Sequence, residues 1–131
     1  MKKKGLLNGE IIKQITELGH TEYFCIADCG LPIASDVQTI DISLIKGVPS
    51  FMEVLKAVSG ELVVESAIIA EEIDVANPFL AKELKNVLRD IKTEKISHAE
   101  FKKRTEKAKC IIRTGEATPY ANIILIGGVN F

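Results

Sequence analysis

Segments with helical periodicity alternate with segments of strand periodicity along these 131 residues, and this alternation narrows the possible folds more than any other property. Residues 9–18 place apolar side chains three and four positions apart, whereas residues 23–27 form a short, β-favouring apolar run. The two patterns keep exchanging up to residue 126, without an internal repeat or a linker. Interleaved helices and strands are typical of a layered α/β domain with a largely buried sheet.

Four segments combine helical spacing with residues that start or stop a helix. Asn8 or the residue after it can begin the first segment, and Gly19 occupies the usual stop position. Pro49 suits the first turn of the second helix, and Ser97 with Glu100 has the form of a capping box at the start of the fourth. The predicted helices span residues 9–18, 49–59, 78–91 and 98–107.

Five segments have the composition or the spacing of strands. Ile40, Ile42 and Leu44 alternate with polar residues, which is the pattern of a half-buried strand. Residues 62–70 form a longer apolar run, which we interpret as a central strand. We therefore expect the α/β class, as a three-layer α/β/α single domain over residues 1–131 with a mostly buried mixed sheet. The predicted strands span residues 23–27, 39–44, 62–70, 110–113 and 122–126.

Composition and charge argue against several classes of function. Hydrophobic residues make up 47% of the chain and charged residues 27%, which is ordinary for a globular protein. A formal net charge of −1 offers no electrostatic footprint for nucleic acid or an anionic membrane, so we expect neither as a partner. No run is long and apolar enough to span a bilayer or to form the core of a signal peptide, and we therefore expect a cytoplasmic protein.

The three cysteines do not indicate a metal site. Cys25 and Cys29 are separated by three residues, Cys110 stands far from both, and the chain has only two histidines. This is not the paired spacing of zinc ligands, so reduced thiols in a cytosolic protein are the simpler interpretation. We predict no bound metal.

Four polar features fall at the ends of the predicted elements. His20 follows the first helix, Asp28 follows the first strand, His98 lies in the first turn of the fourth helix, and residues 120–122 (Tyr-Ala-Asn) lead into the last strand. Ligands of open α/β sheets bind near the carboxyl ends of strands, which favours Asp28 as a site residue. A helix C-terminus favours a charged imidazole and a helix N-terminus a neutral one, so the two histidines could divide acid and binding roles.

Each of these residues also has a structural interpretation. His20 could be a surface residue beside a helix-ending glycine, and Asp28 could bond the amides of the turn at Gly30. His98 could simply tolerate a first-turn position, and the residues before the last strand could satisfy backbone groups at its end. Spacing alone therefore predicts a soluble α/β domain with a polar pocket and leaves its chemistry open.

Several peptides, which together cover nearly the whole chain, carry a resemblance to a known family. They are LGHT at 18–21, DCGLPI at 28–33, GVPSFM at 47–52, AIIAEEI at 67–73, HAEFK at 98–102, IRTGE at 112–116 and PYANIIL at 119–125. In this order and at this spacing they are similar to the D-ribose pyranase and fucose mutarotase family, most of all to its ribose pyranases. One departure is a shortened stretch between residues 78 and 98, which leaves the motifs intact.

The resemblance implies an isomerase of D-ribose catabolism that binds the free monosaccharide, interconverts its pyranose and furanose forms and needs no cofactor. It also implies a cytoplasmic, ring-shaped homo-oligomer, which is a decamer in related members. The family's acid residue falls on His20. Its sugar-binding positions fall on Asp28, His98, Tyr120, Ala121 and Asn122.

The implied chemistry is a pair of proton transfers. Ring opening needs an acid for the ring oxygen and a base for the anomeric hydroxyl, and it needs no phosphate loop or nicotinamide fingerprint, neither of which the sequence contains. We assign His20 as the proton donor and Asp28 as the residue that orients His20 or holds a sugar hydroxyl. The alternatives are a mutarotase for fucose or another monosaccharide, and a non-catalytic sugar-binding accessory of a transporter. In a ring of subunits, the pocket could lie between neighbours.

Overall fold

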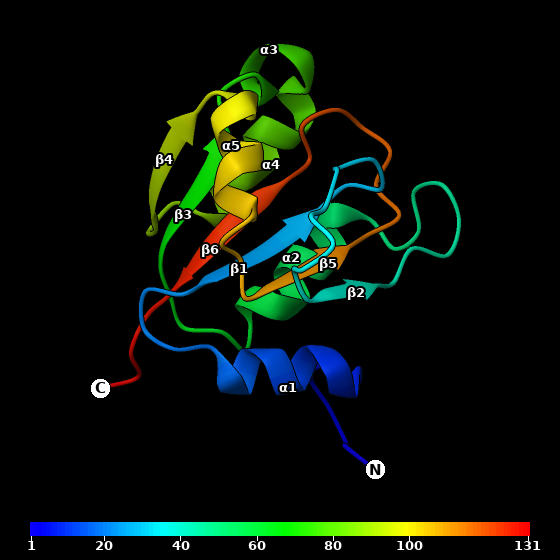
Figure 1. The fold of residues 1–131 in the computed structure, drawn as a ribbon, viewed down its shortest axis with the longest axis vertical. Helices are drawn as coiled ribbons and strands as arrows, with labels where there is room; N and C mark the ends of the chain where they lie inside the picture. Colours follow the sequence, from blue (N-terminus) through cyan, green and yellow to red (C-terminus); the bar gives the residue numbers. More distant parts are fainter.

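The computed structural model describes residues 1–131 and contains one sheet of six strands (Figure 1). The order across the sheet is β2-β5-β1-β6-β3-β4. Five strands run in the same direction, and β6 lies antiparallel between β1 and β3, so the predicted mixed sheet is confirmed. The strands are β1 (Tyr23–Ala27), β2 (Thr39–Asp41), β3 (Val64–Ala70), β4 (Lys92–Ile96), β5 (Cys110–Arg113) and β6 (Ile123–Gly127).

Helices cover both faces of this sheet, which makes three layers. Figure 1 shows α5 in front of the strands and α2 behind them. None of the helices is both long enough and apolar enough to cross a lipid bilayer. The helices are α1 (Gly9–Glu17), α2 (Phe51–Ser59), α3 (Ile73–Ala76), α4 (Pro78–Val87) and α5 (His98–Thr105).

Side chains of the helix caps explain where three of these helices begin. Asn8 caps α1 as predicted, because its side chain accepts a hydrogen bond from the N–H of Ile11. Ser97 likewise caps α5 and accepts from the N–H of Glu100. The prediction for α2 was wrong in detail: Pro49 lies outside the helix, and the next residue forms a reciprocal capping box with Glu53.

Two predicted helix ends also differ from the structure. Gly60 caps the end of α2 as expected, but α1 ends at Glu17, and the extended backbone of Leu18 turns the chain before Gly19 is reached. The left-handed residue of this turn is Thr21, with φ 68°. Helix α4 ends at Val87, so the apolar stripe that runs on toward residue 91 belongs partly to the turn before β4.

The apolar runs located β1 and β5 correctly, whereas the flanking strands were less predictable. Strand β2 has three residues instead of six, and the side chain of Leu44 beyond it is 77% exposed. Strand β4 was not predicted, because its sequence Lys92–Ile96 is largely charged. It pairs only with β3 at the border of the sheet, where charged side chains are tolerated.

Alternating side chains along the inner strands divide the core between the two faces. Phe24 and Ile26 point into a cluster of 20 buried residues shared with α1, α2, α3 and α4. Their neighbours Cys25 and Ala27 point into a second cluster of 8 residues shared with Phe101 of α5. The period of two is that of a strand buried on both faces, and it fixes which residues can reach the ends of the sheet.

Candidate functional site

The carboxyl end of the sheet, where β1 to β5 all finish, gathers most of the predicted site residues. Asp28 follows β1, and Asn122 precedes β6, which enters the sheet at this end. His98 begins α5 directly after β4. Because β1 and β6 are neighbours in the sheet, residues 94 positions apart in sequence meet here. This is the location at which open α/β sheets bind ligands.

Asp28 and Asn122 hold each other through two hydrogen bonds. The Asn122 amide donates to Asp28 Oδ2 at 2.9 Å, and its carbonyl oxygen accepts from the Asp28 N–H at 2.9 Å. The other carboxylate oxygen of Asp28 accepts from the Gly30 N–H at 2.9 Å. Asn122 is fully buried and Asp28 is half-buried. Asp28 therefore bonds the amide of the turn at Gly30, and it also belongs to a polar pair with Asn122.

The ring of His98 is fixed by aromatic neighbours. It stacks on Phe101 at a centroid distance of 6.3 Å and meets the edge of Tyr120 at 5.0 Å. Its backbone N–H donates to both carboxylate oxygens of Glu72, at 2.7 and 3.1 Å. This negative charge at the N-terminus of α5 complements the helix dipole.

Two buried side-chain nitrogens at this end of the sheet have no hydrogen-bond partner, His98 Nδ1 and Arg113 Nε. Arg113 is the last residue of β5, and its guanidinium lies 3.9 Å from Asp41. Buried polar atoms are paired in the great majority of cases. Unpaired donors or acceptors that gather at one end of the sheet are therefore a feature of a site that binds a polar molecule.

The loop before β6 is held in an irregular conformation. Tyr120 has a left-handed backbone, with φ 57°, and its carbonyl accepts from the N–H of Asn122. Ala121 between them is fully buried. The side chain of Asn77 donates to Thr118 Oγ1 and to the Pro119 carbonyl, both at 2.9 Å. Asn77 immediately precedes Pro78 of α4, but its side chain makes no cap hydrogen bond and instead ties this loop to the start of the helix.

Two acidic residues of this region were not expected to take part. Glu72 follows the end of β3, and its carboxylate accepts from the N–H of His98 in the first turn of α5. Glu116 accepts from the N–H of Phe51 through its side chain at 3.3 Å and from the N–H of Cys29 through its backbone. The sequence signal available for Glu116 was its place in the loop motif at residues 112–116. The partners of both residues are remote in sequence, so spacing could not reveal them.

His20 lies at the opposite, amino end of the sheet. It precedes β1, whereas Asp28 follows it, and five strand residues at about 3.3 Å each separate the two ends by roughly 17 Å. Its Nε2 lies 2.8 Å from Glu65 Oε2, and the two side chains are 51% and 53% exposed. Within one chain, the structure therefore brings together Asp28, His98 and residues 120–122 but not His20.

The turn that carries His20 is firmly anchored. The Thr21 N–H donates to the carbonyl of Gly127, whose own N–H donates to the carbonyl of Glu22. The Glu22 carboxylate accepts from the Gly19 N–H at 2.6 Å and from Lys109 Nζ at 3.0 Å. These two donors lower the pKa of Glu22 below its ordinary value. His20 is thus exposed but not loosely placed.

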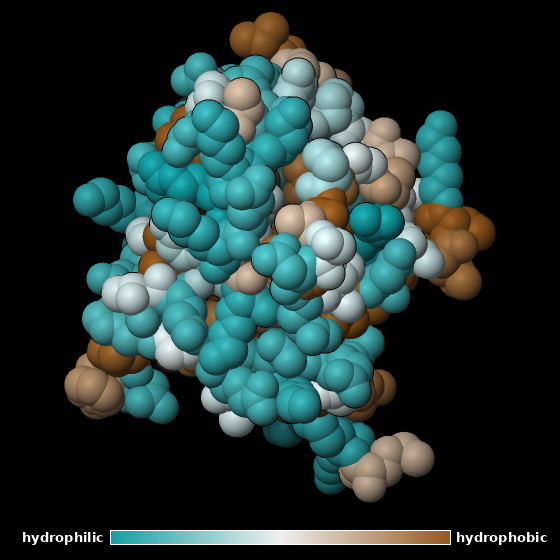
Figure 2. Space-filling view, in the orientation of Figure 1, coloured by the Kyte–Doolittle hydropathy of each residue, from teal (hydrophilic) through white to brown (hydrophobic).

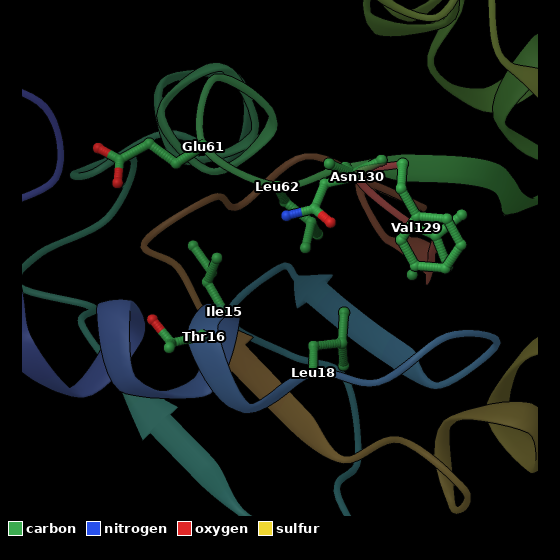
Figure 3. A pocket seen from close by; sticks show the side chains of 11 residues that line it. Ile15, Thr16, Leu18, Glu61, Leu62, Val129 and Asn130 are labelled. Carbon is green, nitrogen blue, oxygen red and sulfur yellow. The ribbon is translucent and has the colours of Figure 1, made fainter.

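A cleft of about 420 Å³ opens beside this turn, between α1 and the last residues of the chain (Figure 3). Ile15, Leu18 and Leu62 line it, and Figure 3 shows their side chains pointing into the space below Asn130. The neighbouring groove is lined by His20, Val63, Glu65, Gly128 and Val129. The amino end of the sheet therefore presents both an open surface and the histidine.

Neither end of the sheet resembles a metal centre. No group of three or more His, Cys, Asp or Glu side chains is arranged to hold a metal ion. Cys25 and Cys110 are buried in the sheet, and burial raises the pKa of the Cys110 thiol to about 12. Cys29 is exposed.

Comparison with known proteins shows similarity over the full length of the chain. The model of the RbsD/FucU transport protein family matches residues 1–130. The D-ribose pyranase of Geobacillus thermodenitrificans is 52% identical over 131 residues, covering 100% of this chain and 99% of that protein. A D-ribose pyranase of Clostridium perfringens is 50% identical over 131 residues, covering 100% of both.

Solved structures show the same fold. Bacillus subtilis RbsD complexed with D-ribose superposes with a TM-score of 0.96, at 46% identity and with 100% of both chains covered. The fucose mutarotase of Streptococcus pneumoniae superposes with a TM-score of 0.81 at 23% identity, over 95% of each chain. The second similarity concerns the fold alone.

Proposed function

Because the chain belongs to the RbsD/FucU family, we propose that it is a D-ribose pyranase, an isomerase that interconverts the pyranose and furanose forms of free D-ribose. The observation that carries this proposal is 52% identity to a curated D-ribose pyranase over all 131 residues. The solved structure of a 46% identical relative contains bound D-ribose. Residues 1–131 would act as one domain.

The reaction consists of proton transfers around one carbon–oxygen bond. The ring oxygen gains a proton and takes the electron pair of its bond to the anomeric carbon, while the anomeric hydroxyl loses its proton to water. The open aldehyde then recloses through the 4-hydroxyl to give the furanose or through the 5-hydroxyl to give the pyranose. A positioned acid contributes typically about 10²–10⁴-fold to such a step.

The carboxyl end of the sheet supplies the groups that bind the sugar. Asp28 offers carboxylate oxygens for sugar hydroxyls, and Asn122 fixes that carboxylate through two hydrogen bonds. His98 and Tyr120 form an aromatic corner with polar tips, and Ala121 leaves the adjacent backbone free of bulk. A polyol is held mainly by hydrogen bonds, so a cluster of fixed polar groups is the expected kind of site.

His20 is assigned as the proton donor to the ring oxygen, and in this fold it can act there only across a subunit boundary. Asp28 and His20 lie at opposite ends of β1, so the role of orienting His20 does not fall to Asp28 of the same chain. We therefore assign Asp28 to a sugar hydroxyl. The complete site combines the carboxyl end of one subunit with the amino end of its neighbour, repeated around a ring.

Surface hydrophobicity supports self-association of this kind. Leu44 and Ile45, at the tip of the loop between β2 and α2, are 77% and 66% exposed, and Figure 2 shows apolar surface at this projection. Exposed apolar groups that cluster on a protein often belong to an interface. The assembly that we propose is a ring-shaped homo-oligomer with ten subunits, a decamer. We propose that it acts in the cytoplasm.

Magnetisation-transfer NMR on D-ribose tests the activity directly. The protein should accelerate exchange between the pyranose and furanose signals, and a His20→Ala variant should bind ribose without doing so. Faster exchange only for fucose or another sugar would instead identify a mutarotase of different specificity. Ribose binding with no accelerated exchange by the unmodified protein would identify a sugar-binding accessory and refute the proposal.

Mixed oligomers test whether the site is shared. His20→Ala and His98→Ala chains should each be inactive alone. Co-expressed in equal amounts, they should form roughly one site in four with both native halves and regain that fraction of activity. A site contained in one chain would regain none.

A further inference from the structure

The backbone at the amino end of the sheet places a carboxylate beside His20 by an irregularity in β3. Val64 pairs with Gly127 and Ser66 pairs with Ile126, so Glu65 is the additional residue of a β-bulge. Bulges change the direction of a side chain and occur often beside active sites. Here the bulged residue is the one whose Oε2 lies 2.8 Å from His20 Nε2.

The partner side of this pair is fixed as well. The His20 turn is held by hydrogen bonds between Thr21, Gly127 and Glu22, and Gly127 also pairs with Val64 next to the bulge. A single backbone segment, the end of β6, therefore positions both the histidine turn and the bulge. The sheet therefore fixes the two backbone positions from which the His20 and Glu65 side chains meet.

From this geometry we propose that Glu65 is a positioning residue for His20: it accepts a hydrogen bond from Nε2 and leaves Nδ1 directed to the sugar. The inference rests on the proposed pyranase function. In the catalytic step, the proton on Nδ1 moves to the ring oxygen of the sugar. At the same time, the bond between the ring oxygen and the anomeric carbon breaks. The proton on Nε2 stays in place, shared with the Glu65 carboxylate throughout.

This assignment gives Glu65 a role different from that of an ordinary surface ion pair. Exposed pairs contribute little because water screens them, and this pair is about half exposed in the isolated chain. When a neighbouring subunit covers it, the same contact operates in a drier environment, in which orientation of the ring and stabilisation of its charged form both become more effective.

The experiment compares kcat and KM for ribose exchange in three variants. Glu65→Ala should lower kcat about tenfold with KM changed less than about twofold, because the ring loses its orientation and not its substrate. Glu65→Gln, which can still accept from Nε2–H but carries no charge, should lose less. Asp74→Asn, which removes a comparably exposed ion pair with Lys95, should retain the full rate. Size-exclusion chromatography of each variant checks that the oligomer is unchanged.

A double-mutant cycle separates positioning from independent action. If Glu65 acts only through His20, then Glu65→Ala should not lower the residual exchange rate of a His20→Ala protein any further. Full kcat in Glu65→Ala, or a raised KM with unchanged kcat, would overturn the positioning role while leaving the pyranase function intact. Failure of the unmodified protein to accelerate ribose exchange would instead remove the function on which the inference rests.

Discussion

At the carboxyl end of the sheet, Asn122 is fully buried and shares two hydrogen bonds with Asp28, whereas at the amino end the His20–Glu65 pair is about half exposed. In the first region, Asp28 and Asn122 are tied to each other within one chain, although His98 Nδ1 and Arg113 Nε are left without a partner. The second has an equally ordered backbone but leaves its side chains open to solvent. In the ring that we propose, a second subunit would cover this open pair.

This difference separates contributions to the stability of the fold from contributions to the reaction, which a single residue often combines. Residues of the carboxyl end should affect both folding and ribose binding, because removing them leaves buried groups unpaired. The exposed side chains of His20 and Glu65 at the amino end should affect the reaction with little effect on folding. Four substitutions or conditions test this division.

The largest effect is expected for His20→Ala. Ribose exchange should fall by about 10²–10⁴-fold because the proton donor is lost. The free energy of unfolding should change by less than about 0.5 kcal/mol, since the histidine and its partner are exposed. NMR exchange and urea unfolding measure the two quantities. A large loss of stability would show that the amino end is not separable from the core.

Asn122→Ala should show the opposite profile. It removes the acceptor of the Asp28 N–H and one donor to the Asp28 carboxylate, so the free energy of unfolding should fall by about 2–3 kcal/mol. Ribose binding should weaken in parallel. Asn130→Ala, at an exposed amide, should change stability by less than about 0.5 kcal/mol and serves as the control. Equal stability of the two variants would contradict the division.

Gly127→Ala tests the link between β6 and the His20 turn. A Cβ at Gly127 would lie 2.6 Å from the carbonyl oxygen of Gly19, so this turn must shift. We expect a loss of about 1–2 kcal/mol in stability, from overpacking, together with slower exchange. Gly9→Ala adds a Cβ with no atom within 4 Å and should be neutral or slightly stabilising. An unaltered exchange rate in Gly127→Ala would show that His20 tolerates movement of its turn.

The smallest expected effect is a change in stability as the pH is lowered. The Gly19 N–H and Lys109 lower the pKa of Glu22 in the folded state, so its contribution to stability is present above the ordinary glutamate range and is lost as the pH falls through the lowered pKa. Thermal unfolding of the native protein and of Glu22→Gln should therefore differ slightly at pH 7, and the difference should vanish once the pH falls below the lowered pKa of Glu22. A difference that persists in acid would assign the stabilisation to something other than this charge.

The sequence was informative wherever structure depends on local pattern. The apolar run of β1 located the strand, and with it the position of Asp28 at its carboxyl end. Ser97 as the cap of α5 likewise placed His98 in a first turn. Local signals of this kind act over a few residues, so a pattern of three or four positions contains them.

What the sequence did not reveal depends on pairing between distant segments. Asp28 meets Asn122 across 94 positions, and Glu65 approaches His20 across 45. Glu65 interrupts an apolar strand and suggests a solvent-facing residue, because a bulge is a property of two paired strands and not of one. Strand β4 was missed for a related reason: its charged sequence is stable only against β3.

The place of β6 in the sheet has a consequence for how the molecule must form. It is the final strand in sequence, yet it lies between β1 and β3 and pairs with both. During synthesis, the ribosome therefore releases the other five strands before β6, which pairs with both β1 and β3, has been made. Co-translational folding cannot close the sheet early, and a chain truncated before residue 122 would expose two hydrophobic strands, a state prone to aggregation.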